Sequence, residues 1–196
     1  MGARTFRESL IRALCAKRNA LVLCALAAMA SMSIGHANEL ALPWIKQKTA
    51  TECGRAVLAS LAAWHGGDIE ALYQKLPAPR DRSRGYSILE IQQAGTRVGV
   101  TLDEIDPDGI TIAGECSDRP SVTAHFRRLA DLVDAGHPVI VATGDASSRG
   151  HYVVLVGAGK DGFTILDPST PGIRTIGAQQ MRAMMCGFGY VALAVK

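Results

Sequence analysis

The sequence has few aromatic residues. Phe, Trp and Tyr make up 5 % of the 196 residues, which disfavours a protein that reads nucleic acid by stacking bases on its side chains. Charged residues are also few, at 20 %, whereas 48 % of the residues are hydrophobic. This balance excludes disorder as the main state, and the length fits one domain with a sizeable core.

One stretch, residues 19–38, has no charged side chain at all. It follows 18 residues that carry five basic side chains and one acidic one, and its apolar part spans residues 20–30. Together with the small residues around Gly35-His36-Ala37, this order is typical of a secretory signal peptide. We predict that residues 1–37 are a signal peptide cleaved after Ala37, and that residues 38–196 form one exported, periplasmic domain.

The alternative is an uncleaved signal segment that anchors the protein and leaves the domain facing the periplasm. The 20 uncharged residues are just enough to span a bilayer. Polar residues within the stretch, among them Asn19, Ser31 and Ser33, make it a poor spanning helix. We therefore expect contact with a membrane only if the signal segment stays uncleaved.

An excess of basic charge is missing from the predicted mature domain. Residues after position 37 include 16 basic and 17 acidic side chains, a net charge of −1. The formal charge of +3 for the whole chain therefore belongs to the signal segment. It gives no electrostatic reason to expect nucleic acid as a partner.

The spacings of metal sites are missing as well. No zinc-type pattern links the histidines of the domain to its cysteines. The acidic stretch from Glu104 to Glu115 imitates a calcium loop, but it begins with Glu and contains a proline. We interpret it as an acidic surface loop and expect no bound metal.

Cysteines become few once the signal is removed. Cys15 and Cys24 leave with it, so that Cys53, Cys116 and Cys186 remain. Disulfides persist outside the cytoplasm, and an odd number of cysteines leaves at least one without a partner in the chain. A disulfide between Cys116 and Cys186 is a hypothesis that leaves Cys53 free.

Apolar residues recur at helical spacing in the first half of the domain, and β-branched runs fill the second half. Helices are predicted over 53–64, 87–98, 123–135 and 179–185, and strands over 138–143, 152–156, 163–166, 173–176 and 190–195. The strands at 152–156 and 163–166 are close enough to form an antiparallel hairpin. Helices packed on an antiparallel sheet make an α+β fold.

Three residues form a candidate catalytic group. Cys53 opens the first predicted helix, where the helix dipole and unpaired N–H groups stabilise a thiolate. His151 begins one strand of the predicted hairpin and Asp167 ends the other, so both should lie at the same edge of the sheet. A carboxylate can orient an imidazole that then acts as a base toward a nucleophile. Taken singly, a buried structural cysteine and a structural histidine are the more common cases.

Gln47 is a fourth candidate, six residues before Cys53. Its side-chain amide and the backbone N–H of Cys53 together suit an oxyanion hole for a tetrahedral intermediate. Without the other residues, a solvated loop glutamine is the simpler interpretation.

The segment around the cysteine, Gln-Lys-Thr-Ala-Thr-Glu-Cys-Gly-Arg-Ala-Val-Leu at 47–58, resembles the cysteine motif of the bacteriocin-processing, or double-glycine, peptidases. The blocks His-Tyr-Val-Val-Leu-Val-Gly at 151–157 and Ile-Leu-Asp-Pro at 165–168 resemble later motifs of the same family. The likeness covers about residues 43–195. It implies a papain-like cysteine peptidase fold.

The resemblance also implies the roles of the residues. The nucleophile of the family falls on Cys53, its base on His151, its orienting acid on Asp167 and its oxyanion glutamine on Gln47. The implied reaction is hydrolysis after Gly-Gly in the leader of a peptide or protein substrate, without a metal or organic cofactor. No transporter segments or nucleotide-binding motif follow the domain, so we expect a stand-alone form whose partner is a separate secretion system or transporter.

Two alternatives remain open from the sequence. The same Cys-His-Asp chemistry serves amidases and transpeptidases that act on other amide substrates. A domain of this kind can also bind leader peptides without cleaving them. The presence of Cys53, His151 and Asp167 favours the peptidase.

Overall fold

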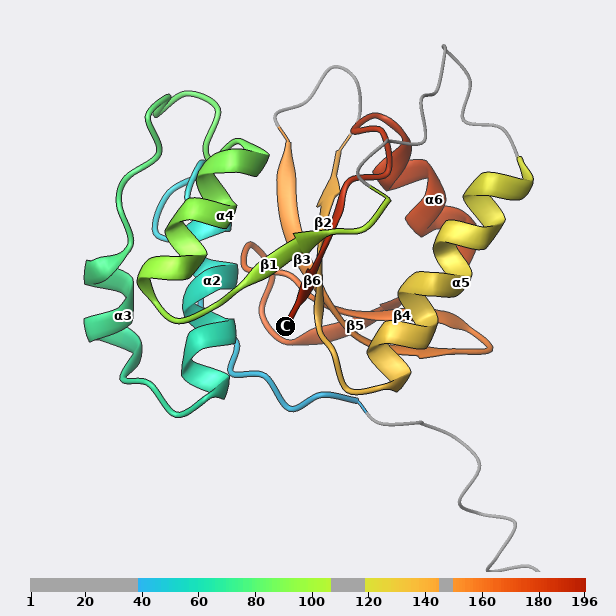
Figure 1. The fold of residues 1–196 in the computed structure, drawn as a ribbon, viewed down its shortest axis with the longest axis horizontal. Coiled ribbons are helices and arrows are strands. Elements are labelled where there is room, and N and C mark those ends of the chain that lie inside the picture. Colours follow the sequence, from blue (N-terminus) through green and yellow to red (C-terminus); the bar gives the residue numbers. More distant parts are fainter. Residues whose placement is uncertain (1–38, 107–118, 145–149) are drawn as a thin grey trace, which may run out of the picture. The chain divides into compact units, whose positions relative to one another are not determined.

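A six-stranded antiparallel sheet lies between two groups of helices (Figure 1). The structure, a computed structural model, describes residues 39–106, 119–144 and 150–196, all within one compact unit that runs from His36 to Lys196. Among these residues, no helix is long and apolar enough to cross a membrane. The predicted signal peptide lies outside the described residues.

The helices and strands of the described residues confirm the predicted α+β fold. The helices are α2 (Cys53–Trp64), α3 (Ile69–Lys75), α4 (Ile88–Arg97), α5 (Pro120–Asp134) and α6 (Ala178–Cys186). The strands are β1 (Leu102–Glu104), β2 (Val139–Thr143), β3 (His151–Gly159), β4 (Gly162–Leu166), β5 (Ile173–Ile176) and β6 (Ala192–Val195). Each predicted helix and strand is present, with ends that differ by up to three residues.

The strands lie in the order β1-β6-β2-β3-β4-β5, and every neighbouring pair is antiparallel. β3 and β4 form the predicted hairpin, in which Leu155 pairs with Ile165. The first residue of β3, His151, pairs with Thr143 at the end of β2. The hairpin therefore brings His151 and the residue after β4, Asp167, to one edge of the sheet.

The two faces of the sheet carry separate parts of the core. Ile140 and Val154 pack with the buried residues of α2 and α4, whereas Val141 and Val153 pack with those of α5 and α6. Figure 1 shows the same division, with α2, α3 and α4 on one side of the strands and α5 and α6 on the other. Alternation of neighbouring residues between two apolar faces explains why these strands read as continuous hydrophobic runs.

Local signals set the helix ends. Ser87 caps α4 through a capping box with Glu90, so the helix begins at Ile88. α5 begins at Pro120, three residues before the predicted start, because proline is favoured at the first helical position. Two elements were not predicted. The short helix α3 buries little apolar surface, chiefly Leu72 and Tyr73, and β1 is a three-residue strand at the edge of the sheet.

Candidate active site

Cys53 is the first residue of α2 and is 3 % exposed. No acidic side chain lies in the first turn of the helix, so the helix dipole acts on the sulfur without a competing charge there. Gly54 follows it and packs closely, since a Cβ at this position would lie 2.6 Å from Cδ2 of Tyr86. The start of α2 is thus a buried, closely packed position with its sulfur at the positive end of the helix dipole.

A polar cluster fixes this first turn. The residue before the cysteine, Glu52, pairs with Arg55 and accepts a 3.3 Å hydrogen bond from the hydroxyl of Tyr73. The guanidinium of Arg55 also donates to the backbone oxygens of Tyr73, at 2.8 Å, and Leu76, at 3.1 Å. Burial and the neighbouring Glu52 carboxylate raise the pKa of Tyr73 to about 12, so its hydroxyl remains a donor. The charge of Glu52 is therefore neutralised beside Cys53, and α2 is tied to α3.

His151 joins the cysteine to the carboxylate. Its Nε2 lies 2.8 Å from Oδ1 of Asp167, and Cys53 is near enough to raise the pKa of His151. Because Nε2 faces the carboxylate, Nδ1 is the ring nitrogen left for the thiol. The hydroxyl of Thr143 donates to the backbone oxygen of His151 at 3.1 Å and holds the strand in place.

Asp167 accepts hydrogen bonds from other groups besides His151. Its Oδ1 also accepts from the backbone N–H of Ser169, at 2.8 Å, and from the hydroxyl of Ser169, at 2.6 Å. Its Oδ2 accepts from the guanidinium of Arg174 at 2.9 Å. The indole N–H of Trp44 donates to the backbone oxygen of Asp167 at 2.8 Å. Asp167 is 3 % exposed, and these contacts fix the direction of its carboxylate toward the imidazole.

The electrostatics of the pair favour its charged form. Burial lowers the pKa of His151, but the hydrogen bonds to Asp167 and Cys53 raise it by more, so that the pKa is about 9. Burial raises the pKa of Asp167, but the hydrogen bonds from His151 and Ser169 outweigh it and hold that pKa well below its usual range. At neutral pH the site therefore contains an imidazolium beside an aspartate.

The structure brings three of the four predicted site residues together and leaves Gln47 apart. The backbone N–H of Gln47 donates to the backbone oxygen of Pro168 at 3.0 Å, so the residue does lie beside the Asp167 segment. Its side-chain Nε2 donates to the backbone oxygen of Thr49 at 2.9 Å, and its Oε1 is buried without a hydrogen-bond partner. In this arrangement the amide does not line the cavity that contains Cys53.

That cavity has a volume of about 760 Å³ and opens between the helices and the sheet. Its walls come from both halves of the fold: Cys53, Asp81, Arg84, Gly85, Tyr86, Ser87, Ile88, Glu90, Ala142, Gly150, His151, Tyr152 and Phe188. Burial raises the pKa of Tyr152 far above its usual value, and its hydroxyl donates to the backbone oxygen of Tyr86 at 3.2 Å. This bond joins the helical wall to the sheet beside the cysteine.

Sequence reasoning missed Tyr86, Tyr152 and Phe188 as walls of the cavity. Tyr152 lies within the motif at 151–157 that carried the resemblance, whereas nothing near Phe188 in the sequence indicates a contact with Gly150. The ring of Phe188 lies against Gly150, where a Cβ would be 2.8 Å from its Cε1. Gly150 directly precedes His151, so this contact fixes the backbone from which the imidazole projects.

We expect Gly150→Ala to lower the rate of Cys53 alkylation by iodoacetamide at neutral pH by about threefold to tenfold. The added methyl group meets the Phe188 ring and displaces His151, the predicted base for Cys53. The double variant Gly150→Ala/Phe188→Leu should recover part of the rate, because the smaller side chain makes room. Rates that are independent of residue 150 would contradict this role for the contact.

The cysteines agree with the predicted division of roles. Cys53 is free, and Cys186 is disulfide-bonded. Cys116 lies outside the described residues, so its pairing with Cys186 stays a prediction. Most of the acidic stretch interpreted as a surface loop also lies outside them, and the described part of the chain contains no group of His, Cys, Asp or Glu suited to hold a metal ion.

Comparisons with known proteins agree on the fold. A C39-like peptidase from Bacillus anthracis superposes with a TM-score of 0.59 at 14 % identity, covering 83 % of this chain and 98 % of that one. The peptidase domain of Streptococcus ComA, a bifunctional ABC transporter involved in quorum sensing, gives 0.54 at 21 % identity over 77 % of this chain and 96 % of that one. A double-glycine motif protease from an AMS/PCAT transporter, solved with its leader peptide, gives 0.51 at 20 % identity over 83 % and 95 %.

These identities are low enough that the structural likeness establishes the fold and nothing finer. A search of curated proteins gave no match. The family assignment comes from the sequence, since the profile of the Peptidase_C39 like family matches residues 16–186. The chain therefore belongs to the Peptidase_C39-like family.

Proposed function

We propose that this protein is a cysteine peptidase that cleaves a peptide bond after Gly-Gly in a leader sequence. The observation that supports the chemistry best is that Cys53 and His151 line the same large cavity, with His151 Nε2 2.8 Å from the carboxylate of Asp167. The family assignment supports peptidase activity in general. The Gly-Gly specificity rests on the motif resemblance and on the relative that was solved with its leader peptide.

In the first half of the reaction, the Cys53 sulfur attacks the carbonyl carbon of the scissile bond. The thiol proton is held on His151 as an imidazolium, which Asp167 stabilises, so the sulfur attacks as a thiolate. The C–N bond then breaks, and the leaving amine takes the proton from Nδ1 of His151. An acyl-enzyme with a thioester to Cys53 remains.

In the second half, water attacks the thioester and His151 again accepts a proton. The C–S bond breaks, the proton stays on His151 beside the thiolate, and the carboxylic acid product leaves and ionises in water. Asp167 stays ionised throughout, since its pKa lies well below its usual range. Its role is to keep Nε2 protonated and Nδ1 directed at the sulfur.

The oxyanion of each tetrahedral intermediate requires donors. The backbone N–H of Cys53, at the start of α2, is one of them. For Gln47 to be the second, its Nε2 must leave the oxygen of Thr49 and turn toward the cavity. The attachment of its backbone to Pro168 keeps Gln47 beside the catalytic carboxylate during such a rotation.

The site of action is part of the proposal. The basic residues, the uncharged stretch and the small residues of segment 1–37 support export to the periplasm. The cavity then meets its substrate outside the cytoplasm, after a separate secretion system or transporter has delivered it.

The decisive experiment incubates the purified protein with a panel of leader peptides that carry Gly-Gly, Gly-Ala or Ala-Ala before the scissile bond. We expect cleavage after the second glycine, detected by mass spectrometry, and no cleavage by Cys53→Ala. Cleavage of Ala-Ala peptides at the same rate as Gly-Gly peptides would contradict the Gly-Gly specificity but would still agree with peptidase activity. Binding of all peptides without cleavage by the unmodified protein would contradict the peptidase.

A further inference from the structure

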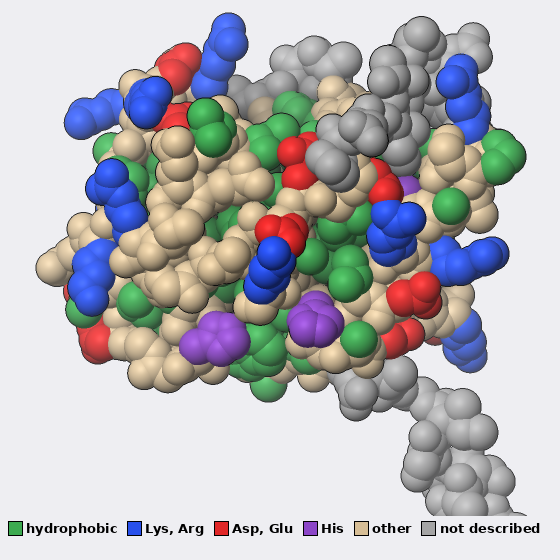
Figure 2. All heavy atoms as spheres, in the orientation of Figure 1, with side chains coloured by type: hydrophobic (Ala, Val, Ile, Leu, Met, Phe, Trp, Pro, Cys, Tyr) green, Lys and Arg blue, Asp and Glu red, His purple; other side chains and the backbone are tan. Residues whose placement is uncertain are grey.

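A loop that carries three arginines forms part of the wall of the active-site cavity, through residues 81 and 84–86. The loop between α3 and α4 carries Arg80, Arg82 and Arg84, which we call the basic rim. The side chains of Arg80 and Arg84 are 83 % and 86 % exposed, and Arg84 lines the cavity together with Cys53. Figure 2 shows Lys and Arg side chains gathered at the upper left of the view, where Figure 1 shows the loop that precedes α4.

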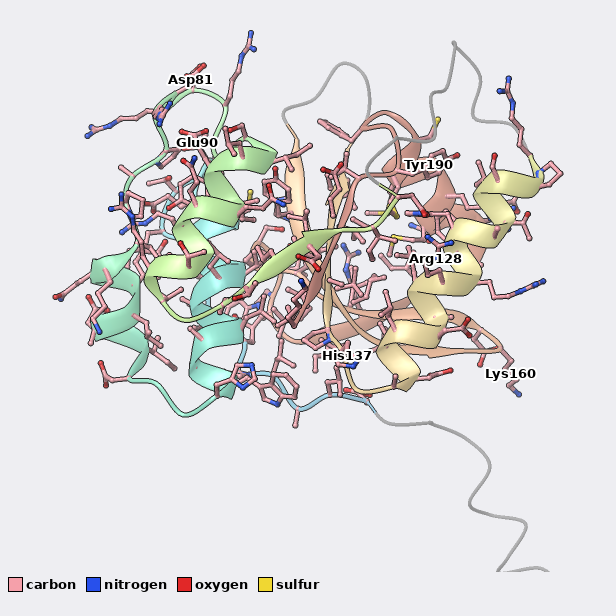
Figure 3. All side chains as sticks on the ribbon, in the orientation of Figure 1. Asp81, Glu90, Arg128, His137, Lys160 and Tyr190 are labelled. Atoms are coloured by element: carbon pink, nitrogen blue, oxygen red, sulfur yellow. The ribbon has the colours of Figure 1, made fainter. Side chains whose placement is uncertain are left out.

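Two acidic residues lie beside the basic rim, but their oxygens are already engaged (Figure 3). Asp81 accepts from the backbone N–H and the hydroxyl of Ser83, at 2.8 and 2.6 Å. Glu90 accepts from the backbone N–H and the hydroxyl of Ser87, at 2.9 and 2.8 Å, and from the backbone N–H of Arg80, at 2.9 Å. These hydrogen bonds lower the pKa of both carboxyl groups.

The ion pairs between these acids and the basic rim are long. Arg84 lies 3.6 Å from Asp81, and Arg80 lies 3.9 Å from Glu90. The loop carries three guanidinium groups beside two carboxylates, so one positive charge is left over, and the side chains of Arg80 and Arg84 are largely exposed to solvent. The predicted mature sequence as a whole has no such excess, since its net charge is −1.

The loop is held in place, so the arginines are presented in a fixed region. The hydroxyl of Tyr86 donates to the backbone oxygen of Pro77. The backbone N–H groups of Arg84 and Gly85 donate to the backbone oxygen of Asp81, at 3.2 and 3.0 Å. Gly85 has a φ of +89° and leaves room for the oxygen of Thr51, 2.8 Å from where a Cβ would lie. A preformed set of donors loses less entropy when a ligand binds.

We infer that the basic rim binds acidic side chains of the substrate, so that the preferred substrates carry Asp or Glu close to the cleaved bond. Guanidinium groups match carboxylates in geometry and charge. This inference rests on the proposed function, which supplies the premise that the substrate is a peptide. It adds a substrate class, acidic peptides, to the Gly-Gly requirement.

The test compares three Gly-Gly peptides: one with two glutamates before the glycines, one with two glutamates after the cleaved bond, and one with glutamine at all these positions. In 20 mM NaCl, we expect one of the two glutamate-containing peptides to have a KM about tenfold lower than that of the glutamine peptide. In 1 M NaCl, where the Debye length is about 3 Å, the difference should nearly vanish. The variant Arg80→Gln/Arg82→Gln/Arg84→Gln should lose the preference, at roughly twofold for each arginine.

The matched control removes three exposed basic side chains that do not line the cavity, in Lys75→Gln/Arg127→Gln/Lys160→Gln. It changes the net charge equally and should keep the preference. Fluorescence anisotropy of the same peptides on Cys53→Ala measures binding without cleavage. An anisotropy preference for glutamate supports the basic rim even if the unmodified protein cleaves nothing. Equal affinities for the glutamate and glutamine peptides would overturn the inference, whether or not cleavage occurs.

Discussion

Replacing His151 by alanine is expected to lower kcat/KM for leader-peptide cleavage by about a thousandfold or more. The imidazolium is the group that holds the thiol proton and gives it to the leaving amine, and no other described histidine lines the cavity. Adding this change to Cys53→Ala should lower the rate no further than Cys53→Ala alone. When two residues act together in one catalytic step, removing either one already abolishes their joint contribution to the rate.

The matched control is His137→Ala. His137 is exposed and precedes β2, whereas His151 pairs with Thr143 at the other end of that strand (Figure 3). It should leave the rate within about twofold of the unmodified protein. Thermal unfolding of each variant separates loss of chemistry from loss of fold. An additive loss in the double variant would mean that His151 and Cys53 act independently.

The positions of Cys53, His151 and Asp167 were predictable from the sequence because they depend on local patterns. The apolar stripe that starts at Cys53 specifies a helix, and two β-rich runs joined by a glycine-containing turn specify a hairpin. A hairpin forces His151 and Asp167 to one edge of the sheet. The further partners of the carboxylate, Ser169 and Arg174, depend on the turn after β4 and on the pairing of β5.

The cavity was less predictable because its walls come from distant segments. Tyr86 and Phe188 lie 102 positions apart in the sequence, and only the packed fold brings both beside Cys53. Gln47 shows a second limit. Its spacing from Cys53 suggests an oxyanion donor, but a local hydrogen bond to Thr49 takes its amide in this structure. Local competition of this kind depends on backbone geometry that spacing does not define.

Replacing Asp167 by asparagine is expected to move the basic limb of the pH–rate profile toward lower pH and to lower kcat by about a hundredfold. The imidazolium persists up to the pKa of His151, about 9, and is lost as the pH rises through that value. Removing the negative charge of Asp167 removes one cause of this raised pKa. The limb should then move toward 6.5, the ordinary value for histidine. Kinetics from pH 5 to 10 measure both effects.

The variant Arg174→Gln tests whether the negative charge of Asp167, rather than its other hydrogen-bond partners, raises the pKa of His151. Arg174 donates to Oδ2, whereas His151 and Ser169 use Oδ1. The glutamine variant therefore keeps the ionised aspartate on the imidazole and should leave the basic limb near pH 9. In Asp167→Asn, the single amide oxygen can still accept from Nε2, so the ring stays oriented and only the charge is lost. A basic limb near pH 9 in this variant would mean that the contact with Cys53, rather than the carboxylate, sustains the imidazolium.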